Sequence, residues 1–157
     1  MGTKLPPLRS SWTKKLEKVN AVGIDSMCFI YQFEAHPLFG PLIFYLFSQL
    51  EERKLKGFTS VLSLAEILSF QKLVENKVAW EEEKQKFYQI PNLEAVEVDG
   101  KICEAAALLR GKYNLHLPDS IQIVTAIFNR ADAFITNDER IKKVKELPII
   151  LLKDYLK

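Results

Sequence analysis

Five short apolar segments, separated by longer segments with apolar residues at helical spacing, constrain the fold of this 157-residue chain more than any other feature. The first of the five is nearly continuous in apolar character, as strands buried on both faces of a parallel sheet are. The predicted order is β-α-β-α-β-α-β-α-β, an α/β fold with a five-stranded parallel sheet, helices on both faces and right-handed crossovers. The predicted strands are residues 19–25, 57–63, 94–99, 133–136 and 147–152.

The segments between these strands predict helices. Pro91 ends the helical segment before the third strand, because proline cannot continue a helix, and Pro118 stands where a new helix begins. The predicted helices are residues 26–35, 38–54, 64–76, 79–89, 101–113 and 119–130.

Charge is distributed unevenly along the chain, whose net charge is +2. Residues 1–20 contain five Lys and Arg residues and one Glu, so they carry +4 and the remainder carries −2. We predict a basic N-terminal extension, residues 1–18, followed by one domain, residues 19–157. The extension could touch nucleic acid, or it could be a solvated and partly disordered start. The domain itself is not strongly basic, so charge alone does not argue for nucleic acid.

Apolar runs are too short for a membrane span, which needs roughly 18 or more residues. The N-terminus also lacks the apolar core of a signal peptide. Cys28 and Cys103 lie in apolar helical patterns, and neither has a second Cys or a His at metal-ligand spacing. We therefore predict a cytoplasmic protein without a membrane segment, in which both cysteines are reduced core residues.

Four acidic residues follow or flank the predicted strands. Asp25 ends the first strand, Glu66 follows the second, Asp119 opens the helix before the fourth strand, and Asp138 follows the fourth strand. In open parallel sheets, ligands bind outside the carboxyl ends of the strands. We therefore expect these four carboxylates to converge at one edge of the sheet.

Each acid also has a structural alternative. Asp25, Asp119 and Asp138 could be helix caps, whose carboxylates accept hydrogen bonds from free backbone N–H groups. Glu66 lies between apolar residues and should face inward or toward a cleft, where an unpartnered carboxylate is costly. Clustered anions raise one another's pKa, and a divalent cation offsets that repulsion. Oxygen ligands without His or Cys favour Mg²⁺ or Mn²⁺ over Zn²⁺.

The ordered set of acids resembles the PIN domain family. The matching pieces are Asp25–Ser26 after the first strand, Glu66 in SLAEIL, Asp119 in LHLPDSIQIVTAI and Asp138 in RADAFITNDERIKKV. Size and layout are similar to the VapC-type toxins of bacterial and archaeal toxin–antitoxin pairs. The resemblance implies a three-layer α/β/α sandwich of Rossmann-like topology and a nuclease that depends on Mg²⁺ or Mn²⁺ and acts mostly on RNA.

The resemblance also implies roles for individual residues. The catalytic and metal-binding acids would be Asp25, Glu66, Asp119 and Asp138. The residues that orient these carboxylates without binding the metal would be Ser26, Thr136 and Asn137. Toxins of this family usually form homodimers and are blocked by an antitoxin that inserts into the cleft. The apolar segment 39–50 could be a surface for either partner, or a buried core helix.

Other functions remain as alternatives. A PIN-like scaffold could bind RNA or protein without cutting, and an active nuclease could process RNA outside a toxin–antitoxin pair. A haloacid dehalogenase phosphatase needs Asp-x-Asp after the first strand, and here the residues are Asp25–Ser26–Met27. A receiver domain needs an acidic pair near the same strand, and a nucleotide-binding module needs a glycine-rich loop; both are missing.

Overall fold

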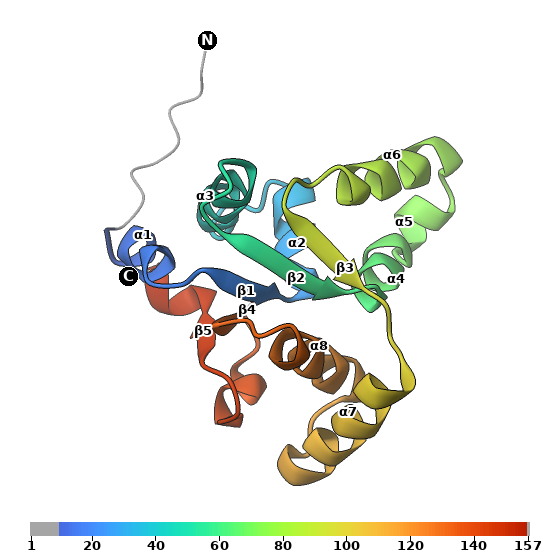
Figure 1. Ribbon diagram of the computed structural model, residues 1–157. Coiled ribbons are helices and arrows are strands. Elements are labelled where there is room, and N and C mark those ends of the chain that lie inside the picture. Colours follow the sequence, from blue (N-terminus) through green and yellow to red (C-terminus); the bar gives the residue numbers. More distant parts are fainter. Residues whose placement is uncertain (1–9, 157) are drawn as a thin grey trace.

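A five-stranded parallel sheet forms the centre of the computed structural model, which describes residues 10–156 (Figure 1). The strand order is β3-β2-β1-β4-β5, and every neighbouring pair is parallel, as predicted. The strands are β1 (Ala21–Ile24), β2 (Lys56–Ser60), β3 (Leu93–Val96), β4 (Ala133–Thr136) and β5 (Ile149–Leu151). β1 and β4 pair in the register Ile24↔Ile135, so both strands end at the same level of the same edge.

Helices cover both faces of the sheet, which confirms the three-layer α/β/α arrangement (Figure 1). One face carries α1 (Ser10–Glu17), α2 (Ser26–Phe33), α3 (Gly40–Glu51) and α6 (Lys77–Tyr88), and the other carries α7 (Gly100–Tyr113) and α8 (Leu117–Phe128). Two hydrophobic clusters fill the two interfaces. The first includes Phe29 and Leu46, and the second includes Ile123 and Phe134.

The helix α8 packs tightly over the sheet at Gly23 of β1. A Cβ atom on this residue would lie 2.5 Å from the Cβ of Ala126 in α8 and 2.7 Å from Cδ2 of Phe134 in β4. Only a residue without a side chain lets α8 pack this closely over β1.

The helix α1 corrects the prediction that residues 1–18 form a solvated extension. Trp12 is completely buried in the first hydrophobic cluster, and Leu16 is buried one turn later. The indole N–H of Trp12 donates to the carbonyl oxygen of Leu42 over 3.0 Å, and its ring packs against Tyr155. The solvated interpretation is therefore wrong for Ser10–Glu17, while the basic residues Lys4 and Arg9 lie outside the described part of the chain.

Two further expectations differ from the structure. The single helix predicted for residues 64–76 is two helices, α4 (Leu62–Leu68) and α5 (Gln71–Val74), because Phe70 between them has an extended backbone. Cys28 is buried as predicted, whereas Cys103 is exposed on α7, on the side that faces away from the sheet.

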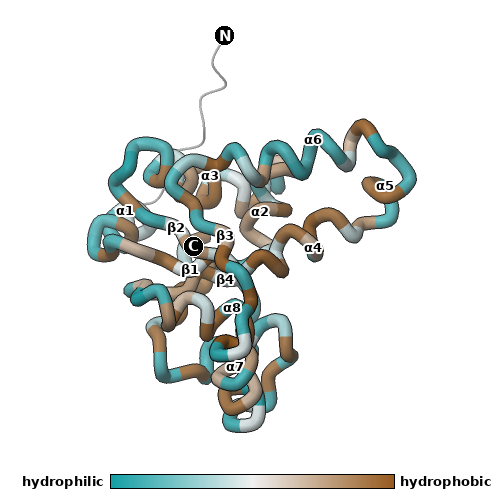
Figure 2. The backbone as a smooth tube through the Cα atoms, turned by 45° about the vertical axis from the view of Figure 1, so that its right-hand side comes forward, coloured by the Kyte–Doolittle hydropathy of each residue, from teal (hydrophilic) through white to brown (hydrophobic). Residues whose placement is uncertain are grey.

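The hydropathy colouring distinguishes the largely apolar α4 from the predominantly hydrophilic α6 (Figure 2).

The apolar helix α3 is mainly a core helix. It buries Leu42, Ile43, Leu46, Phe47 and Leu50 against the first cluster and exposes Phe44. Its length and apolarity do not suffice to cross a membrane, and the same is true of every other helix between residues 10 and 156.

Candidate active site

A cleft of about 800 Å³ lies at the carboxyl edge of the sheet. Six of the seven residues predicted for the site line it: Asp25, Ser26, Glu66, Asp119, Asn137 and Asp138. The seventh, Thr136, is fully buried beneath the cleft at the end of β4. The strand order explains this convergence, because β1 and β4 are neighbours and the helices α4 and α8 begin above the same edge.

Asp25 is a helix cap and a cleft residue at once. Its backbone N–H donates to the carbonyl oxygen of Ile135 over 3.0 Å, which fixes it beside the end of β4. Its Oδ1 accepts the backbone N–H of Ser26 at 2.8 Å and thereby caps α2. Its Oδ2 accepts the hydroxyl of Thr136 at 2.6 Å.

Burial raises the pKa of the Asp25 carboxyl to about 6. The hydrogen bonds from Thr136 and Ser26 act in the opposite direction, and the charges of Asp119 and Glu66 add to the rise. A carboxylate that is 7% exposed and already bonded at both oxygens therefore still lacks full compensation for its charge.

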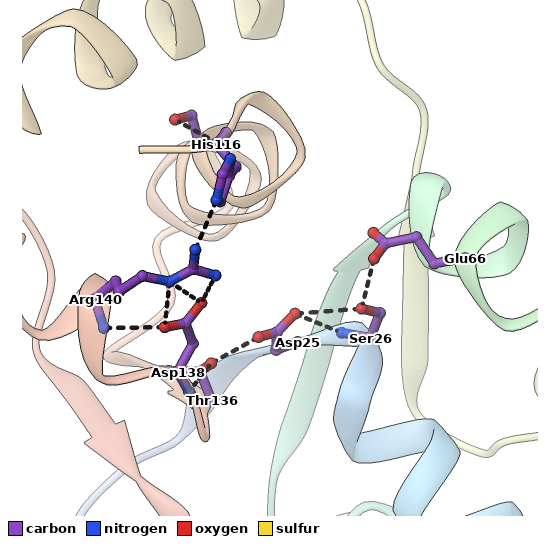
Figure 3. A network of polar contacts seen from close by, with 8 residues as sticks. Asp25, Ser26, Glu66, His116, Thr136, Asp138 and Arg140 are labelled. Atoms are coloured by element: carbon purple, nitrogen blue, oxygen red, sulfur yellow. Dashed lines mark hydrogen bonds and ion pairs between the residues drawn. The ribbon is translucent and has the colours of Figure 1, made fainter. Parts of the chain in front are cut away.

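Glu66 reaches the same site from α4. The hydroxyl of Ser26 donates to its Oε2 over 3.0 Å, and this hydroxyl also lies 3.4 Å from Oδ1 of Asp25 (Figure 3). Ser26 therefore connects the two carboxylates. Glu66 faces the cleft as expected, but its side chain is exposed there rather than buried in the core. Partial desolvation nevertheless raises the pKa of its carboxyl.

Asp119 is not the cap of its helix. The N-cap position of α8 is His116, and Asp119 lies in the first turn, half-buried. Within residues 10–156 its carboxylate accepts no hydrogen bond, so the capping alternative is wrong for this residue. Partial burial and then the charge of Asp138 raise its pKa. Asp119 thus has no hydrogen-bond donor among the described residues and lines the cleft together with Asp138.

Asp138 begins the 3-10 helix η1 (Glu139–Lys143) and caps it, because its Oδ1 accepts the backbone N–H of Arg140 at 2.9 Å. Its own N–H donates to the hydroxyl of Thr136 over 3.1 Å. The Thr136 hydroxyl therefore connects the Asp25 carboxylate to the backbone of Asp138. Hydrogen bonds from the Arg140 side chain lower the pKa of Asp138, in contrast to the three other acids.

Asn137 and three aromatic residues that the sequence did not suggest also line the cleft. The side-chain amide of Asn137 donates to the Tyr31 hydroxyl over 3.2 Å, and its oxygen accepts the backbone N–H of Lys153. The rings of Tyr31 and Phe39 stack at 5.0 Å and both line the cleft, as does Phe70. No spacing in the sequence distinguishes these aromatic residues from ordinary core positions.

The chemistry of the site fits a hard divalent cation. All four acids offer oxygen ligands, and three of them have a raised pKa in its absence. As they stand, however, no three His, Cys, Asp or Glu side chains of the described residues are close enough to hold an ion together. Asp138 is turned toward Arg140 and Glu66 toward Ser26, so binding requires the partly buried Asp138 and the exposed Glu66 side chains to rotate.

Comparison with known proteins agrees with this geometry. The family model described as PIN domain matches residues 24–147. The chain is similar in fold to VapBC2 from Rickettsia felis, a structure bound to a promoter DNA fragment, with a TM-score of 0.65 and 17% identity over 83% of this chain and 98% of that one. It is also similar to a toxin–antitoxin complex from Klebsiella pneumoniae, with a TM-score of 0.61 and 19% identity over 85% and 98%. No curated protein matches the chain.

Proposed function

The chain belongs to the PIN domain family, and from this premise we propose that it is a metal-dependent endoribonuclease that hydrolyses phosphodiester bonds of RNA. The family is one of nucleases. The observation that carries the proposal for this chain is the convergence of Asp25, Glu66, Asp119 and Asp138 on one cleft, with raised pKa values at three of the four acids. Clustered carboxylates with raised pKa values are typical of functional sites, and a bound cation would offset their repulsion.

Each residue has a role in the proposed site. Asp25, Asp119 and Asp138 would hold Mg²⁺ or Mn²⁺, and Glu66 would share the ion or orient the attacking water. The ion supplies charge neutralisation on the phosphoryl group and acidifies water. Thr136 keeps Asp25 ionised and oriented by its 2.6 Å hydrogen bond, Ser26 orients Glu66, and Asn137 braces the segment that presents Asp138.

A histidine-based route has less support. His116 Nε2 contacts Arg140, and Nδ1 of His36 accepts the backbone N–H groups of Leu38 and Phe39. His36 also lies outside the lining of the cleft. General acid–base catalysis needs two groups that reach the substrate. We therefore expect water to attack the phosphorus and the P–O3′ bond to break, which leaves a 5′-phosphate on one product and a 3′-hydroxyl on the other.

We further propose that the enzyme is the toxin of a toxin–antitoxin pair, acts in the cytoplasm and forms a homodimer. Support comes from the similarity in fold to the two toxin–antitoxin structures. A gene for a small DNA-binding protein next to the gene for this chain would agree with this role. Without such a gene, an RNA-processing role would be the better assignment.

The direct test is cleavage of an end-labelled RNA pool by the purified protein with Mg²⁺, with Mn²⁺ and with EDTA. Asp25→Asn should lower the rate by roughly 100-fold or more, since loss of groups that merely support metal ligands already costs roughly 10- to 100-fold. Asp99→Asn is the matched control, because Asp99 caps α7 through the N–H of Ile102 and lies outside the cleft. Equal rates for the two variants would refute the assignment, and RNA binding without cleavage would favour the non-catalytic scaffold.

A further inference from the structure

Arg140 occupies both oxygens of a proposed metal ligand. Its Nε lies 3.0 Å from Oδ1 and 3.2 Å from Oδ2 of Asp138, and its Nη2 lies 2.6 Å from Oδ2 (Figure 3). This is the two-pronged geometry in which a guanidinium matches a carboxylate best. Of the four acids, Asp138 is therefore the one whose charge is already neutralised by the protein itself.

The same guanidinium also contacts the N-cap residue of α8. Its Nη1 lies 2.6 Å from Nε2 of His116, at the start of α8 (Figure 3). Arginine has no acceptor atoms, so Nη1 donates and His116 accepts. Asp119 lies three residues further along α8 and lines the cleft together with Arg140 and Asp138. Arg140 thus connects the segment that carries Asp138 to the helix that carries Asp119.

The ion pair is geometrically complete but open to water. The Arg140 side chain is 61% exposed and that of Asp138 is 25% exposed. Exposed ion pairs contribute little to stability, because water competes for both partners and long side chains lose freedom. A divalent cation attracts the same carboxylate with twice the charge, so it can replace the guanidinium at Asp138 at small cost.

A released guanidinium has a suitable ligand in the proposed reaction. Only two cations, Arg140 and Lys153, line the cleft as it is formed by residues 10–156. Lys153 is ion-paired with Glu139, whereas Arg140 is the one next to the acids. A guanidinium binds two oxygens of a phosphate in the same geometry as two oxygens of a carboxylate.

We propose that Arg140 is an exchangeable counter-ion: it neutralises Asp138 until a divalent metal displaces it, and it then binds an RNA phosphate at the same site. This inference rests on the proposed function, because it requires both a metal and a phosphodiester. It makes Arg140 a positioning residue for the metal and a binding residue for the substrate.

The first test measures Mn²⁺ binding without RNA by electron paramagnetic resonance. Arg140→Gln should bind Mn²⁺ about two- to five-fold more tightly than the unmodified protein, the effect expected for loss of a competing exposed ion pair. Lys142→Gln is the matched control, because it removes one positive charge from the same exposed 3-10 helix at a residue outside the lining of the cleft. It should leave the affinity unchanged. The Mn²⁺ affinity of Arg140→Lys should lie between those of Arg140→Gln and the unmodified protein.

The second test measures binding of a short labelled RNA by fluorescence polarisation with Ca²⁺, which takes the same oxygen ligands, and checks on a gel that the RNA stays intact. Arg140→Gln should weaken RNA binding more than Lys142→Gln does, and Arg140→Lys should restore most of the affinity. If Arg140 had only a structural role, its replacement would not raise the affinity for Mn²⁺ and lower the affinity for RNA in the same variant. Circular dichroism verifies that each variant is folded.

The outcomes separate this inference from the proposed function. If the unmodified protein binds Mn²⁺ and cuts RNA while Arg140→Gln binds Mn²⁺ no more tightly, the inference is wrong and the proposed function stands. If neither protein binds Mn²⁺, the proposed metal site and the inference fail together. If only Arg140→Gln binds Mn²⁺, the inference is supported in its strongest form.

Discussion

Asp25 is a buried carboxylate whose two oxygens serve different neighbours. One oxygen caps α2 through Ser26, and the other accepts the hydroxyl of Thr136. Neither bond offsets the desolvation, since the pKa of this carboxyl is still raised to about 6. The Asp25 carboxylate is therefore desolvated without full compensation for its charge, and a bound cation would offset this cost.

The raised pKa of Asp25 predicts a pH-dependent cost in the metal-free protein. The unfolded chain has an ordinary Asp pKa of about 3.9, so between pH 4 and 6 the folded state binds more protons than the unfolded state. This contribution to stability is present below pH 4 and is lost as the pH rises through 6. Asp25→Asn should therefore gain stability relative to the unmodified protein by roughly 2–3 kcal/mol from pH 4 to pH 7. Urea unfolding in EDTA measures this, and a difference independent of pH would contradict it.

Thr136 is the residue that we expect to tune both acids. Its hydroxyl donates to Asp25 and accepts the N–H of Asp138, so Thr136→Val removes both contacts while preserving shape. Loss of the donated hydrogen bond should raise the pKa of Asp25 further, move the activity profile to higher pH and reduce cleavage by about 10- to 100-fold. Thr136→Ser should retain most of the activity. Equal loss in the Ser variant would mean that the methyl group, not the hydroxyl, matters.

At the scale of elements, two close contacts hold the layers that present the site. One is α8 against β1 at Gly23, and the other is α1 against the first hydrophobic cluster through Trp12. Both lie away from the cleft lining, so both should affect stability before they affect chemistry.

Gly23→Ala should destabilise the fold by about 1–3 kcal/mol, the usual cost of overpacking, because its methyl group would overlap Ala126 and Phe134. Gly111→Ala in α7 is the control. Nothing lies within 4 Å of an added Cβ there, and alanine favours a helix over glycine by about 0.8–1 kcal/mol, so this variant should be at least as stable as the unmodified protein. Chemical denaturation compares the two, and equal stability of both variants would mean that α8 shifts freely over β1.

Trp12→Ala should cost about 3–5 kcal/mol of unfolding free energy, because it empties a fully buried site and leaves the Leu42 carbonyl without its donor. Lys14→Ala on the exposed side of the same helix should change stability by no more than about 0.5 kcal/mol. If Trp12→Ala were equally mild, α1 would not be part of the core in solution.

These elements also show which parts of the fold the sequence could reveal. The strands were predictable because short strand-like segments alternate with longer helical ones, although β4 is buried at every position and β3 at none. The helix α1 was not, since its eight residues carry only two apolar contacts, Trp12 and Leu16, among charged ones. The break at Phe70 and the outward direction of Cys103 depend on tertiary packing, which overrides local periodicity.

At the scale of the whole molecule, topology assembles the site. The order β3-β2-β1-β4-β5 makes the first and fourth strands neighbours, so Asp25 and Asp138 line the same cleft although they are 113 positions apart in the sequence. The rule that ligands bind at the carboxyl edge of a parallel sheet was therefore enough to predict that the four acids would converge at one edge, and they line one cleft there. It could not find the contact of Arg140 with Asp138, because that depends on the tight turn into η1 and on two side-chain rotamers.

We propose that four acids from distant parts of the chain together form one metal site. The most direct measurement is an anomalous difference map from crystals soaked in Mn²⁺, with a matched EDTA-treated crystal. We predict a peak in the cleft within coordination distance of the Asp25 and Asp138 carboxylates, with Arg140 turned away from Asp138. A cleft without a peak, in crystals that keep the ion pair between Arg140 and Asp138 at saturating Mn²⁺, would contradict the account.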